Sequence, residues 1–441
     1  MTRADSARIA YVGALEVIDS RGNPTIRATV TLESGHTASA TVPSGASTGE
    51  GEACEVRDGD PQRYYGLGVR KALGAIEGPL RQALVGMSVE DQNIIDQRLI
   101  EADGTQNKSH LGANALLSLS LAVAHARAAH EGRSLYSSLS QQHGGPISLP
   151  CPMLNIINGG MHAANNLEIQ EFMIRPHGAP TFSEAMRWSC EIYACLRNIL
   201  RRRGHPTTVG DEGGFAPFLR KETEALDLLI EAVEGAGLKP GLQVSFALDC
   251  AASSLYNPED EIYEERKKKL NNEVYQTYSS EEYVDFIENL VDQYPIDSVE
   301  DALAEEDWEG WKVLSKRLGH RVQIVGDDLF VTNPLFLQRG IDNGIANAIL
   351  IKPNQIGTLT ETFETIALAK ENGYRIILSH RSGETCDTTI SDIAVAADAG
   401  QIKAGSVCRS ERVSKYNRLL YIESSEGMHL FRDHNPFSIV E

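Results

Sequence analysis

Six charged or ionisable residues in the C-terminal half each end or follow a short apolar run. They are Asp249, Glu300, Asp327, Lys352, His380 and Lys403. If the apolar runs are strands of one sheet, the six side chains gather at one edge of it. Three carboxylates there could bind a hard metal ion, while lysine and histidine could transfer protons. The pattern therefore predicts a catalytic mouth.

The spacing of these residues indicates the elements that must position them. Most intervals are about 25 residues, the length of a strand, a loop and a covering helix, and the interval from Asp249 to Glu300 is about twice as long. Repeated β/α units of this kind predict a β/α barrel. The C-terminal strand ends of such a barrel carry its functional groups.

The N-terminal region has a different pattern. Apolar and polar residues alternate through 26–32, so residues 8–45 are predicted to form antiparallel strands. Residues 67–87 and 113–131 are predicted helices, and the second is apolar on nearly all sides. Residues 134–152 are rich in Ser, Gly and Pro and are expected to connect two domains. The one basic run, residues 266–269, is expected on a solvated surface.

Bulk composition limits the class of protein. A chain of 441 residues is long enough for two domains, and its net charge of −20 disfavours nucleic acid or an anionic membrane as a partner. Seven cysteines without a CxxC pair favour a reducing, cytoplasmic environment over a disulfide framework. There is no run of about 18 apolar residues, so we expect neither a signal peptide nor a membrane span.

Several longer motifs carry a resemblance to a known family. They are PSGASTG at 43–49 with EVRDGD at 55–60, NGGMHA at 158–163 with QEFMI at 170–174, GDEGGFAP at 210–217, LIKPNQIG at 350–357 and SHRSGET at 379–385. From about residue 8 to residue 425 the sequence resembles the enolases (phosphopyruvate hydratases) in motif order and spacing. The resemblance implies an α+β N-terminal capping domain, residues 1–140, followed by a modified (β/α)8 TIM-type barrel, residues 141–441.

The three carboxylates suit a metal by their chemistry alone. Asp249, Glu300 and Asp327 offer only oxygen ligands, which select a hard cation such as Mg²⁺ when waters and substrate complete the shell. The enolase resemblance implies two Mg²⁺ ions per site. Ser47, in the glycine-rich loop, would reach the second ion when this loop closes over the substrate.

The resemblance also implies acid–base roles. Lys352 would remove the proton next to the substrate carboxylate, with its pKa lowered by Lys403 and the metal. Glu212 would protonate the departing hydroxyl, with Glu171 alongside, because two close carboxylates raise each other's proton affinity. His162 would close over the reacting end of the substrate.

Substrate contacts are expected from one set of residues: His162, Glu171, Lys352, His380, Arg381, Ser382 and Lys403. Within this set, Arg381 and Ser382 offer a bidentate donor and a hydroxyl, which suit a phosphate, and His380 opens the same segment. The resemblance thus implies a small phosphorylated carboxylate substrate, and an assembly that is at least a homodimer.

Five residues beside the motifs depart from the usual enolase pattern. They are Phe218 for asparagine, Ser254 and Cys386 for acids, Ala302 for proline and Ala404 for threonine. Neighbours of catalytic groups set their geometry, so these departures leave the substrate open. The leading hypothesis is interconversion of 2-phosphoglycerate and phosphoenolpyruvate. The alternatives are a related synthase of natural-product pathways, acting on a phosphonate or phosphate carboxylate, and a non-catalytic protein on the same scaffold.

Overall fold

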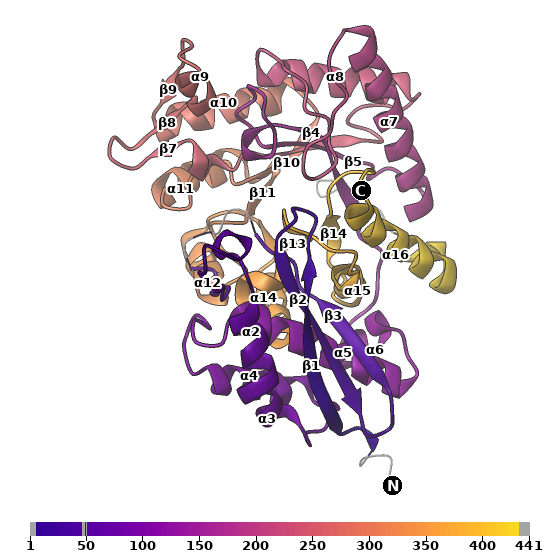
Figure 1. The fold of residues 1–441 in the computed structure, drawn as a ribbon. Helices are drawn as coiled ribbons and strands as arrows, with labels where there is room; N and C mark the ends of the chain where they lie inside the picture. Colours follow the sequence, from indigo (N-terminus) through magenta and orange to yellow (C-terminus); the bar gives the residue numbers. More distant parts are fainter. Residues whose placement is uncertain (1–5, 46–48, 50, 432–441) are drawn as a thin grey trace.

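The computed structural model describes residues 6–45, 49 and 51–431. Figure 1 shows two parts, an N-terminal sheet with its helices and a larger β/α barrel. The predicted fold class is thereby confirmed.

The N-terminal part is built on an antiparallel sheet of three strands, β1 (Ile9–Ile18), β2 (Pro24–Leu32) and β3 (Thr37–Thr41), in that order. The alternating apolar side chains of β2 are buried and pack towards helix α5 (Ala113–Glu131). Most positions of α5 are buried, as its all-round apolar sequence predicts.

The other N-terminal helices differ from the expectation. The predicted helix at 67–87 is a run of three segments, α2 (Arg70–Ala75), a π-type turn η2 (Ile76–Leu80) and α3 (Arg81–Leu84). Pro79 lies in the π-type turn, where its missing N–H and its ring do not fit a regular helix.

Two further helices were not predicted from the sequence. Helix α4 (Gln92–Asp103) begins after Asp91, whose side chain caps the helix. Most of its residues are polar, so the apolar stripe that would have predicted a helix is weak. Helix α6 (Leu135–His143) lies inside the segment that was expected to be only a connection. Its serines conceal an apolar face of Leu135, Tyr136 and Leu139, which is buried.

The barrel is closed by eight strands. In order around the barrel they are β4 (Cys151–Asn158), β5 (Glu171–Arg175), β6 (Ser245–Asp249), β10 (Ile296–Glu300), β11 (Gln323–Gly326), β12 (Ala348–Ile351), β13 (Arg375–Ser379) and β14 (Gly400–Lys403). Strand β5 is antiparallel to both neighbours, and the other pairs are parallel. The first residue of β5 therefore lies at the same end as the last residues of the other strands.

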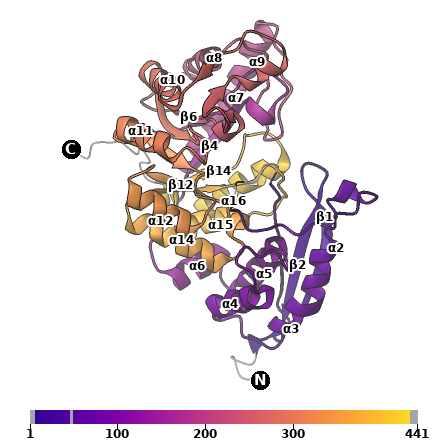
Figure 2. The same ribbon diagram turned by 90° about the vertical axis from the view of Figure 1, so that its left-hand side faces the viewer.

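Helices surround the barrel (Figure 2). They are α7 (Phe182–Arg202), α8 (Glu222–Gly235), α10 (Ser280–Gln293), α11 (Trp308–Leu318), α12 (Pro334–Asn343), α14 (Leu359–Glu371), α15 (Thr389–Ala396) and α16 (Ser410–Glu426). Short helical turns lie in the connections: η1 (Tyr64–Gly66), η3 (Gly160–His162), η4 (Ala252–Ser254), α13 (Pro353–Ile356) and η5 (Met428–Leu430).

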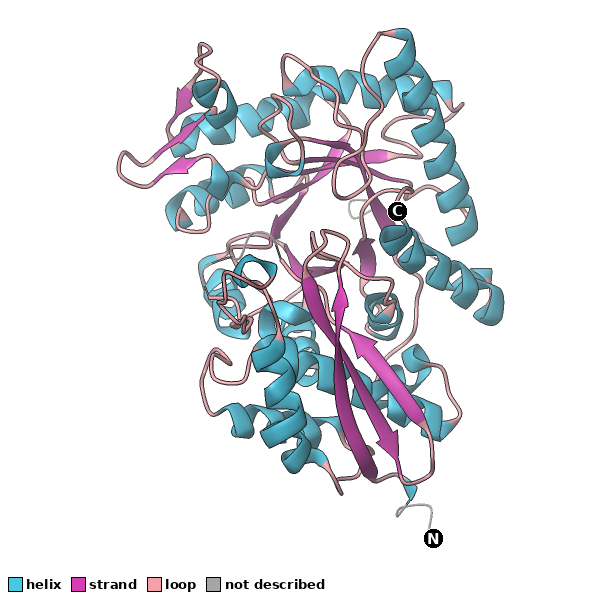
Figure 3. Ribbon diagram, viewed as in Figure 1, coloured by secondary structure: helices cyan, strands magenta, loops and turns pink. Residues whose placement is uncertain are grey.

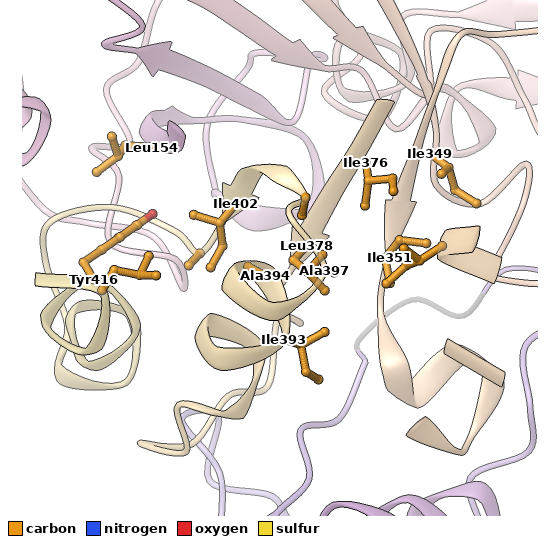
Figure 4. Packing of buried hydrophobic residues seen from close by; sticks show 14 of the residues in the cluster. Leu154, Ile349, Ile351, Ile376, Leu378, Ile393, Ala394, Ala397, Ile402 and Tyr416 are labelled. Atoms are coloured by element: carbon orange, nitrogen blue, oxygen red, sulfur yellow. The ribbon is translucent and has the colours of Figure 1, made fainter. Parts of the chain in front are cut away.

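Two apolar layers hold the barrel. The inner layer includes Met153, Met173, Val325 and Leu350, and it fills the space between the strands. The outer layer packs the strands against the helices, as Figure 4 shows for Ile351, Leu378, Ile393 and others. No helix in the described part of the chain is long and apolar enough to cross a membrane.

An insert explains the long interval between Asp249 and Glu300. It contains a small sheet, β7 (Tyr256–Asn257), β8 (Ile262–Glu264) and β9 (Thr277–Tyr278), and helix α9 (Arg266–Leu270). In Figure 3 it projects from the barrel as three short strands beside helices. Helix α9 carries the basic run and has no buried residue, which agrees with the expected surface position. Arg266 and Lys269 are exposed, whereas Lys267 and Lys268 are half-buried.

Candidate active site

The six residues of the sequence pattern all lie at strand ends of the barrel. Asp249, Glu300 and Lys403 are the last residues of β6, β10 and β14, and the other three directly follow β11, β12 and β13. All but Glu300 line one cavity. Glu300 is fully buried and accepts a hydrogen bond from Lys403, which lines the cavity.

Lys403 is the cationic centre of this mouth. Its Nζ donates to Asp249 at 2.8 Å and to both oxygens of Glu300 at 2.9 Å, and it lies 3.4 Å from Glu171. Burial by itself lowers the pKa of Lys403, but these carboxylates together hold it well above its usual value. Lys403 is therefore a fixed positive charge.

Lys352 makes an ion pair with Asp327 on the neighbouring strand end. Burial lowers the pKa of Lys352, but the charges of Asp327, Glu300 and Asp328 together outweigh this effect and the net shift is upward. The net lowering expected from Lys403 and the metal is thus not seen among the described residues, where the carboxylates around Lys352 dominate. A cation bound to Asp327 would compete with Lys352 for this carboxylate.

Two carboxylates from outside the row of strand ends face the same cavity. Glu171 begins β5 and Glu212 lies in the loop between α7 and α8, and His162 Nδ1 is 3.7 Å from an oxygen of each. Burial and the charge of Glu212 raise the pKa of Glu171 well above its usual value. Burial acts on Glu212 in the same direction, but nearby positive charge outweighs it and holds the pKa of Glu212 well below the usual value. The contributors are His380 and His162 when they are protonated, and the permanent charges of Arg412 and Lys403.

The raised proton affinity therefore falls on Glu171 rather than on Glu212, contrary to the sequence expectation. Burial also lowers the pKa of His380 well below its usual value, so this ring is neutral around pH 7. Oxygens of Glu171 and Glu212 lie within 4.8 Å of each other, and a carboxyl group with a raised pKa, as Glu171 has, is what a proton donor at neutral pH needs.

Glu212 is held by a residue of the barrel wall that sequence reasoning missed. Asn155, fully buried on β4, donates from Nδ2 to Glu212 Oε2 at 3.1 Å. An asparagine in an apolar strand, three residues before the NGG motif, is the signal that could have identified it.

His162 reaches the cavity because two chain segments approach each other closely. A Cβ on Gly159 would lie 2.3 Å from the carbonyl oxygen of Ile169, and one on Gly160 would lie 2.8 Å from Gln170 Cβ. Gly160 also has φ +47, a conformation that glycine tolerates. The two glycines thus allow η3 to lie against the start of β5 and to place His162 beside Glu171.

The segment after β13 carries Arg381 and Ser382 into the cavity. A second arginine, Arg412 on α16, holds this segment by donating to His380 Nδ1 and to the carbonyls of Arg381 and Ser382. Arg412 was not among the residues predicted from the sequence. Its helical spacing to the buried Tyr416 and Leu419 marks it as a charge on a buried helix face.

The carboxylates of the mouth fit a divalent cation. Asp249, Glu300 and Asp327 end or follow the adjacent strands β6, β10 and β11. Burial and the charge of Asp249 raise the pKa of Glu300 well above its usual value, although Lys403 and Lys352 act in the opposite direction. An oxygen-only set with surplus negative charge favours Mg²⁺.

The structure adds Asp301 and Asp328 to this acidic group. Ligand oxygens of Asp301, Asp327 and Asp328 lie within 4.8 Å of one another. Asp301 has φ +40 and accepts the backbone N–H groups of the other two, both at 2.9 Å, so it fixes the turn after β11. Ser47, expected at a second metal, lies outside the described residues.

The five departures from the enolase pattern lie in different surroundings. Phe218 and Cys386 are exposed, and Ser254 is half-buried with its Oγ on the carbonyl of Ala251. Ala302 and Ala404 are fully buried, and Ala404 directly follows Lys403. Of the five, these two are the buried neighbours of the reaction cavity.

Comparison with family models covers nearly the whole chain. Residues 9–139 match the model described as the enolase N-terminal domain. Residues 146–432 match the model described as the enolase C-terminal TIM barrel domain. The order of the two matches agrees with the small sheet domain and the closed barrel seen here. The chain therefore belongs to the enolase family.

Proposed function

We propose that this protein is a Mg²⁺-dependent hydro-lyase that interconverts 2-phosphoglycerate and phosphoenolpyruvate. One observation carries the proposal: the base and the acids lie on opposite walls of one cavity. Lys352 follows β12, and Glu171 begins β5, four strands away in a closed ring of eight. A substrate between them can lose a proton to one wall and a hydroxyl group towards the other.

Proton removal is the task of Lys352. Its neutral amine takes the proton from the carbon next to the substrate carboxylate, and the electron pair left on that carbon delocalises into the carboxylate. Lys403, fixed by Asp249 and Glu300, provides a permanent positive charge for the growing negative charge.

Mg²⁺ would be held by Asp249, Glu300 and Asp327, and would supply positive charge to the substrate carboxylate. By family resemblance, Ser47 would serve a second ion.

Loss of the hydroxyl group is the task of the opposite wall. The proton shared by Glu171 and Glu212 passes to the 3-hydroxyl oxygen, the C–O bond breaks, and water leaves as the double bond forms. His162 lies beside both carboxylates and covers this end. Arg381 and Ser382 bind the phosphate.

The proposal extends to the ligand, the assembly and the cellular location of the protein. We infer a small phosphorylated carboxylate as the ligand, a homodimer or a higher homo-oligomer as the assembly, and a cytoplasmic location. The net charge of −20 argues against a nucleic-acid partner.

A direct assay tests the proposal. Purified protein with Mg²⁺ and 2-phosphoglycerate is expected to produce the ultraviolet absorbance of the enol product. Chelation of the metal should abolish the signal, and added Mg²⁺ should restore it. Absence of product at high enzyme concentration, with correctly folded protein, would refute the assignment.

A second candidate is supported by Ala302 and Ala404. Both are buried next to metal- or substrate-side residues, so they favour a related phosphonate or phosphate carboxylate as substrate. A substrate screen with the wild type and with the double variant Ala302→Pro, Ala404→Thr distinguishes the candidates. A switch of preference towards 2-phosphoglycerate supports the second candidate, and identical preferences reject it.

A further inference from the structure

We propose that Glu52, which follows the glycine-rich loop of the N-terminal domain, is a positioning residue for Arg381 in the barrel. The inference rests on the proposed function in one respect, that Arg381 is the group that binds the substrate phosphate. Glu52 itself has no part in the chemistry proposed above.

The contact between the two side chains is bidentate and buried. Arg381 Nη1 donates to Glu52 Oε2 at 3.0 Å, and Nη2 donates to Glu52 Oε1 at 3.2 Å. The side chains are only 4% and 7% exposed. A planar guanidinium held at both terminal nitrogens has its orientation fixed, which a single hydrogen bond does not achieve.

Glu52 approaches Arg381 from the side away from the reaction cavity. Arg381 lines the cavity that holds Lys352 and Glu212, whereas Glu52 lines a second cavity with Pro43, Gly49 and Asn354. Asn354 Oδ1 also accepts from Arg381 Nη1, at 3.3 Å. The arginine is thus supported from behind by Glu52 and Asn354 while it faces the substrate side.

The same carboxylate is connected to the metal-side acids. Gln355 Nε2 lies 3.3 Å from Glu52 Oε1 and 3.1 Å from Asp327 Oδ1, and its Oε1 accepts from Thr332. The backbone N–H of Ala53 donates to the Gln355 carbonyl at 2.8 Å. Glu52 therefore fixes Arg381 and Asp327 in one frame, although it belongs to a different domain.

Charge and position make opposite predictions for Glu52. A negative charge beside a phosphate site repels the phosphate, so a pure charge effect predicts tighter anion binding when Glu52 is neutralised. Positioning predicts weaker binding. Asp327 and Asp328 also attract Arg381, so an arginine released by Glu52 can turn towards these acids and away from the substrate.

The contact geometry favours positioning. The two hydrogen bonds from Arg381 to Glu52 fix the guanidinium directly. The repulsion between Glu52 and a phosphate is weaker, because the guanidinium lies between the two negative groups. We therefore expect the loss of orientation to outweigh the relief of repulsion.

Calorimetric titration with inorganic phosphate, in the presence of Mg²⁺, tests the inference independently of turnover. Glu52→Gln should bind phosphate roughly tenfold more weakly than the wild type, the loss expected for one charge-assisted contact, and Glu52→Asp should lie between them. Glu55→Gln is the matched control. This variant removes one negative charge from the same segment. Arg57, the partner of Glu55, still donates hydrogen bonds to the carbonyls of Pro24 and Leu67.

Phosphate binding by Glu52→Gln that equals or exceeds that of the wild type overturns the inference, as does an equal loss in Glu55→Gln. If Glu52→Gln does not fold, Glu52→Asp gives the same comparison. A wild type that binds no phosphate also refutes it. A wild type that binds phosphate but does not turn over 2-phosphoglycerate refutes the proposed function alone. With active enzyme, KM should rise more than kcat falls.

Discussion

The strand ends of the barrel and the loops above them supply the candidate site in different ways. Asp249 and Glu300 are register partners on β6 and β10, and Ser379 and Lys403 are register partners on β13 and β14. Backbone pairing thus sets their positions directly. Glu212 and Glu52 come from loops, and each is held by a contact with a barrel side chain, Asn155 or Arg381.

This difference separates fixed charges from adjustable ones. A strand-end side chain can be changed without moving its backbone, because the ladder of hydrogen bonds remains. A loop carboxylate depends on a few side-chain contacts for its orientation, so changing one of these neighbours can move the carboxylate while the barrel stays intact. Variants on the two sides should therefore fail in different ways.

The largest effect is expected at a strand end. Lys352→Met removes the base and should lower kcat by about 10⁴-fold, the upper range for a positioned proton acceptor. Exchange of the substrate's carbon-bound proton with deuterated water should stop as well, and NMR measures this exchange. Unchanged circular dichroism provides the folding control. Residual exchange at the wild-type rate would remove Lys352 from the proposed role.

Replacement of the loop acid Glu212 should block loss of the hydroxyl group, the step that follows proton removal. Glu212→Gln is expected to lower kcat by about 10²–10³-fold, because the carboxylate that shares the proton with Glu171 beside the leaving hydroxyl is lost. Proton exchange at the neighbouring carbon should continue, because Lys352 and Lys403 remain in place. Simultaneous loss of exchange and product formation would contradict the division of labour between the two walls.

The same contrast decides what the sequence could predict. The row of strand-end residues could be predicted from the sequence, because a barrel repeats its strands and helices at a regular interval and each of these strands is closed by a charged or ionisable residue. The residues that orient the site could not be predicted in this way. Asn155, Glu52 and Arg412 act through contacts with segments that are far away in the sequence. Helices α4 and α6 were missed for a local reason, since their polar residues conceal a narrow buried face.

A smaller effect is expected where a strand supports a loop acid. Asn155→Leu keeps a similar size but removes the donor to Glu212, so kcat should fall about tenfold to thirtyfold, the cost of a charge-assisted hydrogen bond. KM should change little, because the phosphate side is untouched. Asn155→Asp places a second negative charge beside Glu212 and should be more severe. Equal kcat in the wild type and Asn155→Leu would show that Glu212 needs no support from β4.

The smallest effect concerns the contact between the insert and the loop of His162. Glu168 accepts the backbone N–H groups of Lys267 and Lys268, at 2.9 and 3.3 Å, and Lys267 Nζ donates to the carbonyl of Ala163 at 3.0 Å. Helix α9 therefore holds the chain that follows His162. Burial raises the pKa of Glu168 from 4.5 to about 7.

The pKa of Glu168 gives the sign of a pH effect on stability. Between pH 4.5 and about 7 the folded protein binds a proton at Glu168 that the unfolded chain releases, so the free energy of unfolding falls as pH rises through this window. Glu168→Gln removes the titration and keeps an oxygen to accept the N–H groups. Relative to the wild type, this variant should gain roughly 1–2 kcal/mol between pH 5 and pH 7. Melting temperatures at both pH values measure the gain, with the exposed Glu234→Gln on α8 as control. A difference from the wild type that does not change with pH would mean that Glu168 is not the group that titrates.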